Sequence, residues 1–159
     1  MRRPEVNLRH LEDHSVSLAD ELTPEELDID TKDELIQVDE PLEYELEVEK
    51  TEDGLLVQGA LRLTLSCKCA RCLKPFRYDL ELGGWVTHIP LEGEEKAAVV
   101  NDVVDLTPYV REDIVLAFPQ RPLCGPDCEG LPGTDTSSPA NAGPLTSNPW
   151  AELNKLKLK

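Results

Sequence analysis

The chain has 159 residues, which is enough for one domain with a hydrophobic core plus a tail. Aromatic residues make up only 4% of it, so the core must consist mainly of leucine, valine and isoleucine. The formal net charge of -16 argues against sequence-independent binding to nucleic-acid phosphates, because such binding needs a basic surface. This acidity favours a basic protein partner or only local contact with RNA, although acidity also serves solubility alone.

The first forty residues are acidic and only weakly patterned. Apolar residues between Val6 and Leu11 predict a short strand or edge segment. A short helix is expected from Thr23, which suits the N-cap, and from Pro24, which suits the first helical position. Glu26 stands in the capping-box position, and we expect one or two turns.

Strict alternation then predicts an antiparallel meander. Apolar residues and glutamates alternate over residues 42–49, which indicates a half-buried strand with a glutamate row facing out. Asp53-Gly54 is a hairpin-turn signal, and a return strand follows over residues 57–65, where Arg62 lies on the side that faces the glutamate row. A third strand runs from Phe76 to Ile89, with Gly83-Gly84 as a bulge or sharp twist.

The rest of the chain predicts one main helix and a tail. After a short strand at Val99-Val100, Thr107 is expected to cap a helix with Pro108 in its first turn, and Pro119 to stop it. Residues 132–149 are rich in Pro, Gly, Ser, Thr and Asn and predict a linker, and residues 150–159 predict a short basic helix. The expected fold is therefore α+β, a partly closed or barrel-like meander with a helix after it, in a domain over residues 1–131.

Five cysteines form two clusters. Cys69 and Cys72 are spaced C-x-x-C, and Cys124 and Cys128 are spaced C-x-x-x-C. Two such turns can supply the four sulfurs of a tetrahedral zinc site, at about 2.3 Å each. Cys67 is the fifth cysteine, which could replace Cys69 as a ligand or be an extra thiol. We expect little effect from its replacement by serine.

Two other readings of the cysteines stay open. They could be ordinary reduced thiols or a vestigial metal site. They could also form a redox dithiol, although thioredoxin-like chemistry uses a C-x-x-C that opens a helix, whereas Pro75 and a strand follow here. An odd cysteine count without a visible secretory signal or membrane span indicates a reducing cytoplasm and no membrane partner.

No enzyme signature is visible. His10 and His14 have i, i+4 spacing without an H-E-x-x-H motif and are interpreted as solvated surface residues, and His88 as structural. Acidic residues are so abundant that no pair can be singled out for acid–base chemistry. We therefore expect a protein that is not an enzyme.

The order of these features resembles the YceD family, the large ribosomal RNA subunit accumulation proteins. The resemblance covers about residues 40–131 and the terminal segment. Four stretches and the tail carry it: Gln58-Gly59-Ala60-Leu61, Cys69-Ala70-Arg71-Cys72-Leu73-Lys74-Pro75-Phe76, Val104-Asp105-Leu106-Thr107-Pro108, Pro122-Leu123-Cys124 and, in the tail, Asn148-Pro149-Trp150-Ala151.

The resemblance implies a role in large-subunit ribosomal RNA accumulation or processing and in ribosome assembly. It implies that the metal-type positions are Cys69, Cys72, Cys124 and Cys128, with structural zinc as the cofactor and Cys67 as an extra. Many relatives carry a further C-P-x-C-G segment after the Gly-Leu pair, whereas this chain has Leu131-Pro132-Gly133.

Two hypotheses for function follow. The first is a non-enzymatic assembly factor that contacts a ribosomal protein or a pre-large-subunit particle, with ribosomal RNA touched only locally. Its C-terminal helix would dock on a ribosomal partner or fold back on the acidic sheet. The second, from a different class, is a thiol redox or redox-sensing protein that uses Cys67, Cys69 and Cys72.

Overall fold

A computed structural model describes residues 3–132 of the chain. The larger sheet is antiparallel throughout, in the order β2-β4-β5, with β6 on the far side of β5 and the short β3 beside the end of β5. Its strands are β2 (Val16–Leu22), β3 (Ile36–Gln37), β4 (Leu42–Lys50), β5 (Gly54–Lys68) and β6 (Pro75–Pro90).

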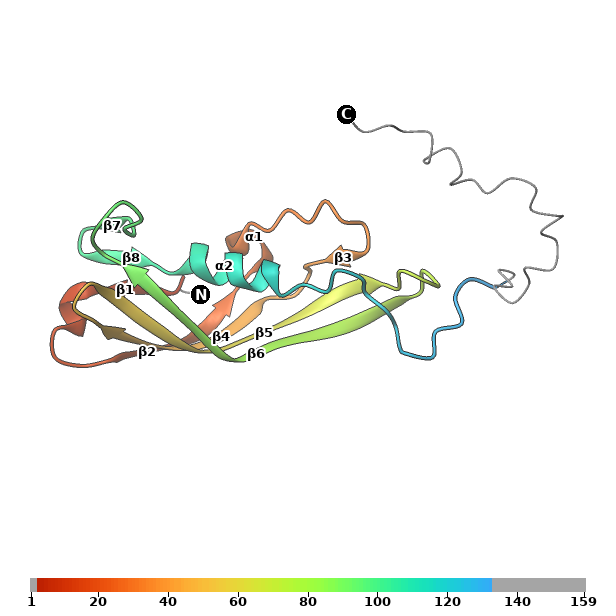
Figure 1. Cartoon of the computed structure of the whole chain (residues 1–159), viewed down its shortest axis with the longest axis horizontal. Helices are drawn as coiled ribbons and strands as arrows, with labels where there is room; N and C mark the ends of the chain where they lie inside the picture. The colour runs from red at the N-terminus through yellow and green to blue at the C-terminus, as the bar shows by residue number, and fades with distance from the viewer. Residues whose placement is uncertain (1–2, 133–159) are drawn as a thin grey trace, which may run out of the picture.

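A second, smaller antiparallel sheet lies over one end of the first. Its order is β1-β8-β7, from β1 (Glu5–Asn7), β7 (Val99–Val100) and β8 (Val103–Asp105). The helical elements are a 3₁₀ turn, η1 (Leu8–Leu11), a short α1 (Pro24–Leu27) and α2 (Thr107–Leu116). Figure 1 shows α1, α2 and the smaller sheet on the same side of the curved larger sheet.

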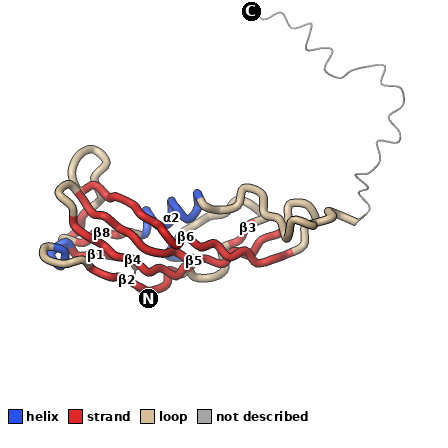
Figure 2. Tube along the Cα trace, turned by 60° about the horizontal axis from the view of Figure 1, so that its bottom comes forward, coloured by secondary structure: helices blue, strands red, loops and turns tan. Residues whose placement is uncertain are grey.

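The predicted fold class is confirmed. The strands β4, β5 and β6 form the expected meander and run side by side along the molecule (Figure 2), and the sheet curls into a half-barrel with one main helix after it. The predicted bulge is also present, because Gly59 pairs with Trp85 while Leu61 pairs with Leu82.

The core lies between the inner face of the larger sheet and the elements above it. Because apolar residues alternate along each strand, one face of β4 and β5 carries almost all the buried side chains. From α2, Val110 and Ile114 are fully buried against this face. As the scarcity of aromatics predicted, most of the core is aliphatic, including Leu42, Leu46, Val48, Leu55, Val57, Leu61, Leu63 and Leu65.

The edge strand β2 is the largest element that the sequence did not predict. It pairs with β4 over its whole length, from Val16 opposite Val48 to Leu22 opposite Leu42. Only Leu22 is buried in it, because an edge strand of a sheet packed on one face has few contacts to make. This sparse burial explains why its sequence shows no clear alternation.

The helix starts differ in how they are capped. At α1 the predicted capping box is present: the Thr23 side chain accepts from the Glu26 amide, and the Glu26 carboxylate accepts from the Thr23 amide. At α2 the prediction of Thr107 as cap is wrong, because Thr107 lies inside the first turn, where its side chain is buried. The carboxylate of Asp105 accepts from the Thr107 amide instead, at 2.8 Å.

One side-chain hydrogen bond ties α2 to the larger sheet. The indole Nε1 of the buried Trp85 donates to Oδ2 of Asp113 at 2.6 Å. Replacing Asp113 with alanine leaves that N–H without its partner, so we expect the free energy of unfolding to fall by about 1.5–3 kcal/mol. Alanine at the exposed neighbour Glu112 is the control. Equal denaturation midpoints for the two variants would show that the bond contributes nothing.

Two predictions concern residues beyond this part of the chain. The linker (132–149), apart from Pro132, and the C-terminal helix (150–159) lie outside the described residues. Within residues 3–132, no helix is long and apolar enough to cross a membrane.

Candidate functional site

The structure brings the four predicted cysteines together. Cys69 and Cys72 lie on the turn that joins β5 to β6, and Cys124 and Cys128 lie on the segment after α2. The Sγ atoms of Cys69 and Cys128 are 3.6 Å apart, and those of Cys72 and Cys124 are 3.7 Å apart. All four Sγ atoms lie within 4.8 Å of one another.

Backbone hydrogen bonds hold the two segments in place. The turn is closed by the Cys69 amide, which donates to the Lys74 carbonyl at 2.9 Å, and by the Leu73 amide, which donates to the Cys69 carbonyl at 2.8 Å. The Ala70 amide donates to the Pro122 carbonyl at 2.8 Å, which joins the turn to the chain returning from α2. The site therefore links two parts of the fold that are far apart in sequence.

These distances fit a zinc ion. A tetrahedral ZnS₄ centre with Zn–S bonds of about 2.3 Å has sulfur–sulfur edges of about 3.8 Å. The two closest pairs lie near this value, well beyond a disulfide bond of about 2.0 Å. Because each sulfur has three sulfur neighbours, the arrangement matches a four-ligand site better than a single reactive pair.

The pKa values of two thiols in the cluster are shifted in opposite directions. Burial raises the pKa of Cys69, but hydrogen bonds from the backbone amides of Cys124, Cys72 and Arg71 outweigh it and lower the pKa to about 5. Hydrogen bonds with Cys128, Cys72 and Cys69 raise the pKa of Cys124 to about 12. A metal ion binds cysteine as the thiolate, so a divalent cation among these sulfurs would favour their deprotonated form.

Cys67 is separate from this cluster. It is a β5 residue, 2% exposed, that pairs with Phe76 and Ile36 and belongs to the hydrophobic core. Burial, and then the negative charge of Asp33, raise the pKa of its thiol. Burial replaces the expectation that serine at this position has little effect with an expected loss of stability, because a hydroxyl would be buried among apolar side chains.

None of the three histidines belongs to the cysteine cluster of the described residues. His10 and His14 are exposed, as expected. His88 lies on β6 with its Nε2 3.2 Å from the Asp53 carboxylate, beside the β4–β5 turn, which agrees with a structural role.

A second candidate site is the outer face of the larger sheet, defined as the face away from α2. Its rows run across three strands: Ser17, Glu47 and Gln58; Ala19, Glu45 and Ala60; Glu21, Glu43 and Arg62. Arg62 faces the glutamate row as predicted, but its ion pair is with Glu81 of β6, at 3.3 Å. This outer face is acidic, and Figure 1 shows no described helix or sheet covering it.

The fold and the cysteine site define a class: a curled antiparallel sheet with one main helix and a four-cysteine cluster of metal-binding type. A family model described as "Large ribosomal RNA subunit accumulation protein YceD" matches residues 57–157, more than half of the chain. The chain belongs to this family, as the resemblance indicated. The family description points to a role in the accumulation of large-subunit ribosomal RNA.

Curated relatives come from mycobacteria. Uncharacterized proteins of Mycobacterium bovis and of two strains of Mycobacterium tuberculosis are each 32% identical to the chain over 140 residues. The match covers 76% of this chain and 65% of each relative, so the chain spans less than two thirds of their length. No solved structure matches the chain significantly.

Proposed function

We propose that this protein is a non-enzymatic factor for large-subunit ribosomal RNA accumulation and ribosome assembly, and that it acts mainly by contacting a basic protein of the precursor large subunit. The observation that carries the proposal is the acidic outer face, left uncovered by the described elements, in a chain of this family. Ribosomal proteins are basic, so their charge is complementary to this face.

The charge of the chain disfavours RNA as the main partner. A chain of net charge -16 repels phosphates unless it offers a local basic patch. Such a patch exists at the cysteine turn, where Lys68, Arg71 and Lys74 are exposed and make no ion pair within residues 3–132. These cations support the proposal that any local contact with ribosomal RNA is made at this end of the molecule.

The four cysteines would hold structural zinc. Bound there, the ion supplies a cross-link between the β5–β6 turn and the segment that follows α2. In this proposal the thiolates keep the helix exit against the sheet and carry out no redox chemistry.

Binding measurements with purified components test the proposal. We expect the protein to bind one or more large-subunit ribosomal proteins, with an affinity that falls as salt rises because the contact is between opposite charges. Naked large-subunit ribosomal RNA should bind more weakly. Tight, salt-sensitive binding to naked RNA, with none to ribosomal proteins, would contradict the proposal.

A further inference from the structure

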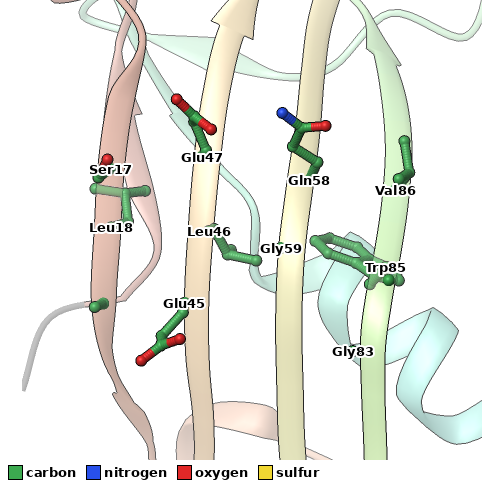
Figure 3. A pocket seen from close by; sticks show the side chains of 12 residues that line it. Ser17, Leu18, Glu45, Leu46, Glu47, Gln58, Gly59, Gly83, Trp85 and Val86 are labelled. Carbon is green, nitrogen blue, oxygen red and sulfur yellow. The ribbon is translucent and has the colours of Figure 1, made fainter.

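The outer face contains a groove. A cavity of about 550 Å³ crosses β2, β4, β5 and β6 near the middle of the sheet. Figure 3 shows Glu45, Glu47 and Gln58 on adjacent strands, with the Trp85 ring beside Gly59. Gly83, Gly84 and Val86 form the β6 side of the groove.

The glycine pair lies at the β6 bulge, but neither crowding nor a left-handed φ demands glycine there. A Cβ on Gly83 or Gly84 would meet no atom within 4 Å, and neither residue has a left-handed φ. Glycine in the interior of a strand weakens the strand, and it often marks a place where another backbone approaches closely. Since no described atom lies within 4 Å of a Cβ built on either glycine, the space on this side is open to an external occupant of the groove.

The other side chains of the groove define the chemistry of that occupant. Glu45 and Glu47 place two carboxylates on its β4 side, and neither makes an ion pair with a described residue. Val86 is 58% exposed and adds an apolar contact on the opposite side. Cations flanking a short apolar side chain would satisfy both sides, whereas a polyanion would be repelled.

We infer that this groove binds an extended, lysine- and arginine-rich segment of a polypeptide, whose backbone passes over Gly83 and Gly84 with its cations at Glu45 and Glu47. The inference rests on the proposed function, in which the segment belongs to a ribosomal protein of the large subunit. It locates that contact on the outer face, at a distance along the sheet from the cysteine cluster.

Two kinds of variant test the groove in the full-length protein. Gly84→Phe places a bulky ring in the groove, starting from a Cβ that meets no atom within 4 Å. Its control is Val100→Phe, which adds a ring at an exposed position outside the groove. The double variant Glu45→Lys/Glu47→Lys reverses its charge, and Glu94→Lys/Glu95→Lys makes the same change of net charge in an exposed loop. Thermal melts establish that all four variants are folded.

The probes are purified large-subunit ribosomal proteins and a synthetic peptide of alternating lysine and valine. We expect Gly84→Phe and Glu45→Lys/Glu47→Lys each to weaken binding by about tenfold or more, and both controls to bind within about twofold of the parent. The charge-reversal variant should also lose most of the salt dependence of binding.

The outcomes separate the inference from the proposed function. If the parent binds ribosomal proteins and neither groove variant changes the affinity, the groove assignment is wrong and the proposed function stands. If the parent binds no ribosomal protein, the proposed function fails. If only a peptide of residues 148–159 fills the groove, while ribosomal proteins bind elsewhere, the occupant is the chain's own tail and the inference is overturned.

Discussion

Replacing Cys72 with serine is expected to release zinc and to lower the melting temperature together, by on the order of 10 °C or more. The reason is that Cys72 is only half-buried, so its main energetic contribution would be as a ligand. With one thiolate missing, the cross-link between the β5–β6 turn and the segment after α2 is lost. Elemental analysis of the purified protein and a thermal melt measure the two effects.

Cys67→Ser is the matched control for this experiment. Because Cys67 is buried in the core and outside the cluster, its replacement should leave the zinc content unchanged. It should lower the free energy of unfolding by about 1–3 kcal/mol through the buried hydroxyl. Unchanged zinc content and melting temperature in Cys72→Ser would mean that the site holds no zinc and that no metal cross-link exists.

Gly59→Ala is expected to destabilise the protein by about 3 kcal/mol or more. A Cβ at this position would lie 1.9 Å from the carbonyl oxygen of Glu45 and 2.9 Å from Cα of Leu46. Both are backbone atoms of β4, so no side-chain rotation can relieve the overlap, and β4 and β5 would have to separate. Gly59 also has φ +157°, a conformation that residues with a side chain rarely adopt.

Gly84→Ala, on the neighbouring strand β6, is expected not to destabilise the protein. Its Cβ has open space around it, so alanine should leave stability unchanged or raise it by about 0.5–1 kcal/mol. Urea denaturation of the two variants measures the difference. A Gly59→Ala variant as stable as the parent would show that β4 can move away freely, which would contradict the close packing described here.

The elements that the sequence predicted well are those with a strong local signal. Alternation over residues 42–49 identified β4, because one face is packed and the other faces solvent. The capping box at Thr23 identified α1 for a similar reason, since its hydrogen bonds form within four residues. The start of α2 has no such signal, because its N-cap is Leu106 without a side-chain cap hydrogen bond, and the Asp105 carboxylate accepts from the Thr107 amide.

The cysteine site was predictable from spacing and turn residues, but its membership was not. The sequence left Cys67 as a possible substitute for Cys69, since the two are two residues apart in the chain. The choice depends on where β5 ends. Cys67 still pairs with Phe76 and points into the core, whereas Cys69 follows the last strand residue and faces Cys128.

By itself the sequence determined the meander, the main helix and the two cysteine clusters, because alternation, helix periodicity and turn chemistry act over a few residues. Only the tertiary structure decided that the weakly patterned residues 16–22 form the edge strand β2, since that pairing depends on β4. The same holds for the groove, because Ser17, Glu45, Gln58 and Gly84 come from four strands. Such a surface exists only after long-range pairing has set the register, and no local pattern encodes it.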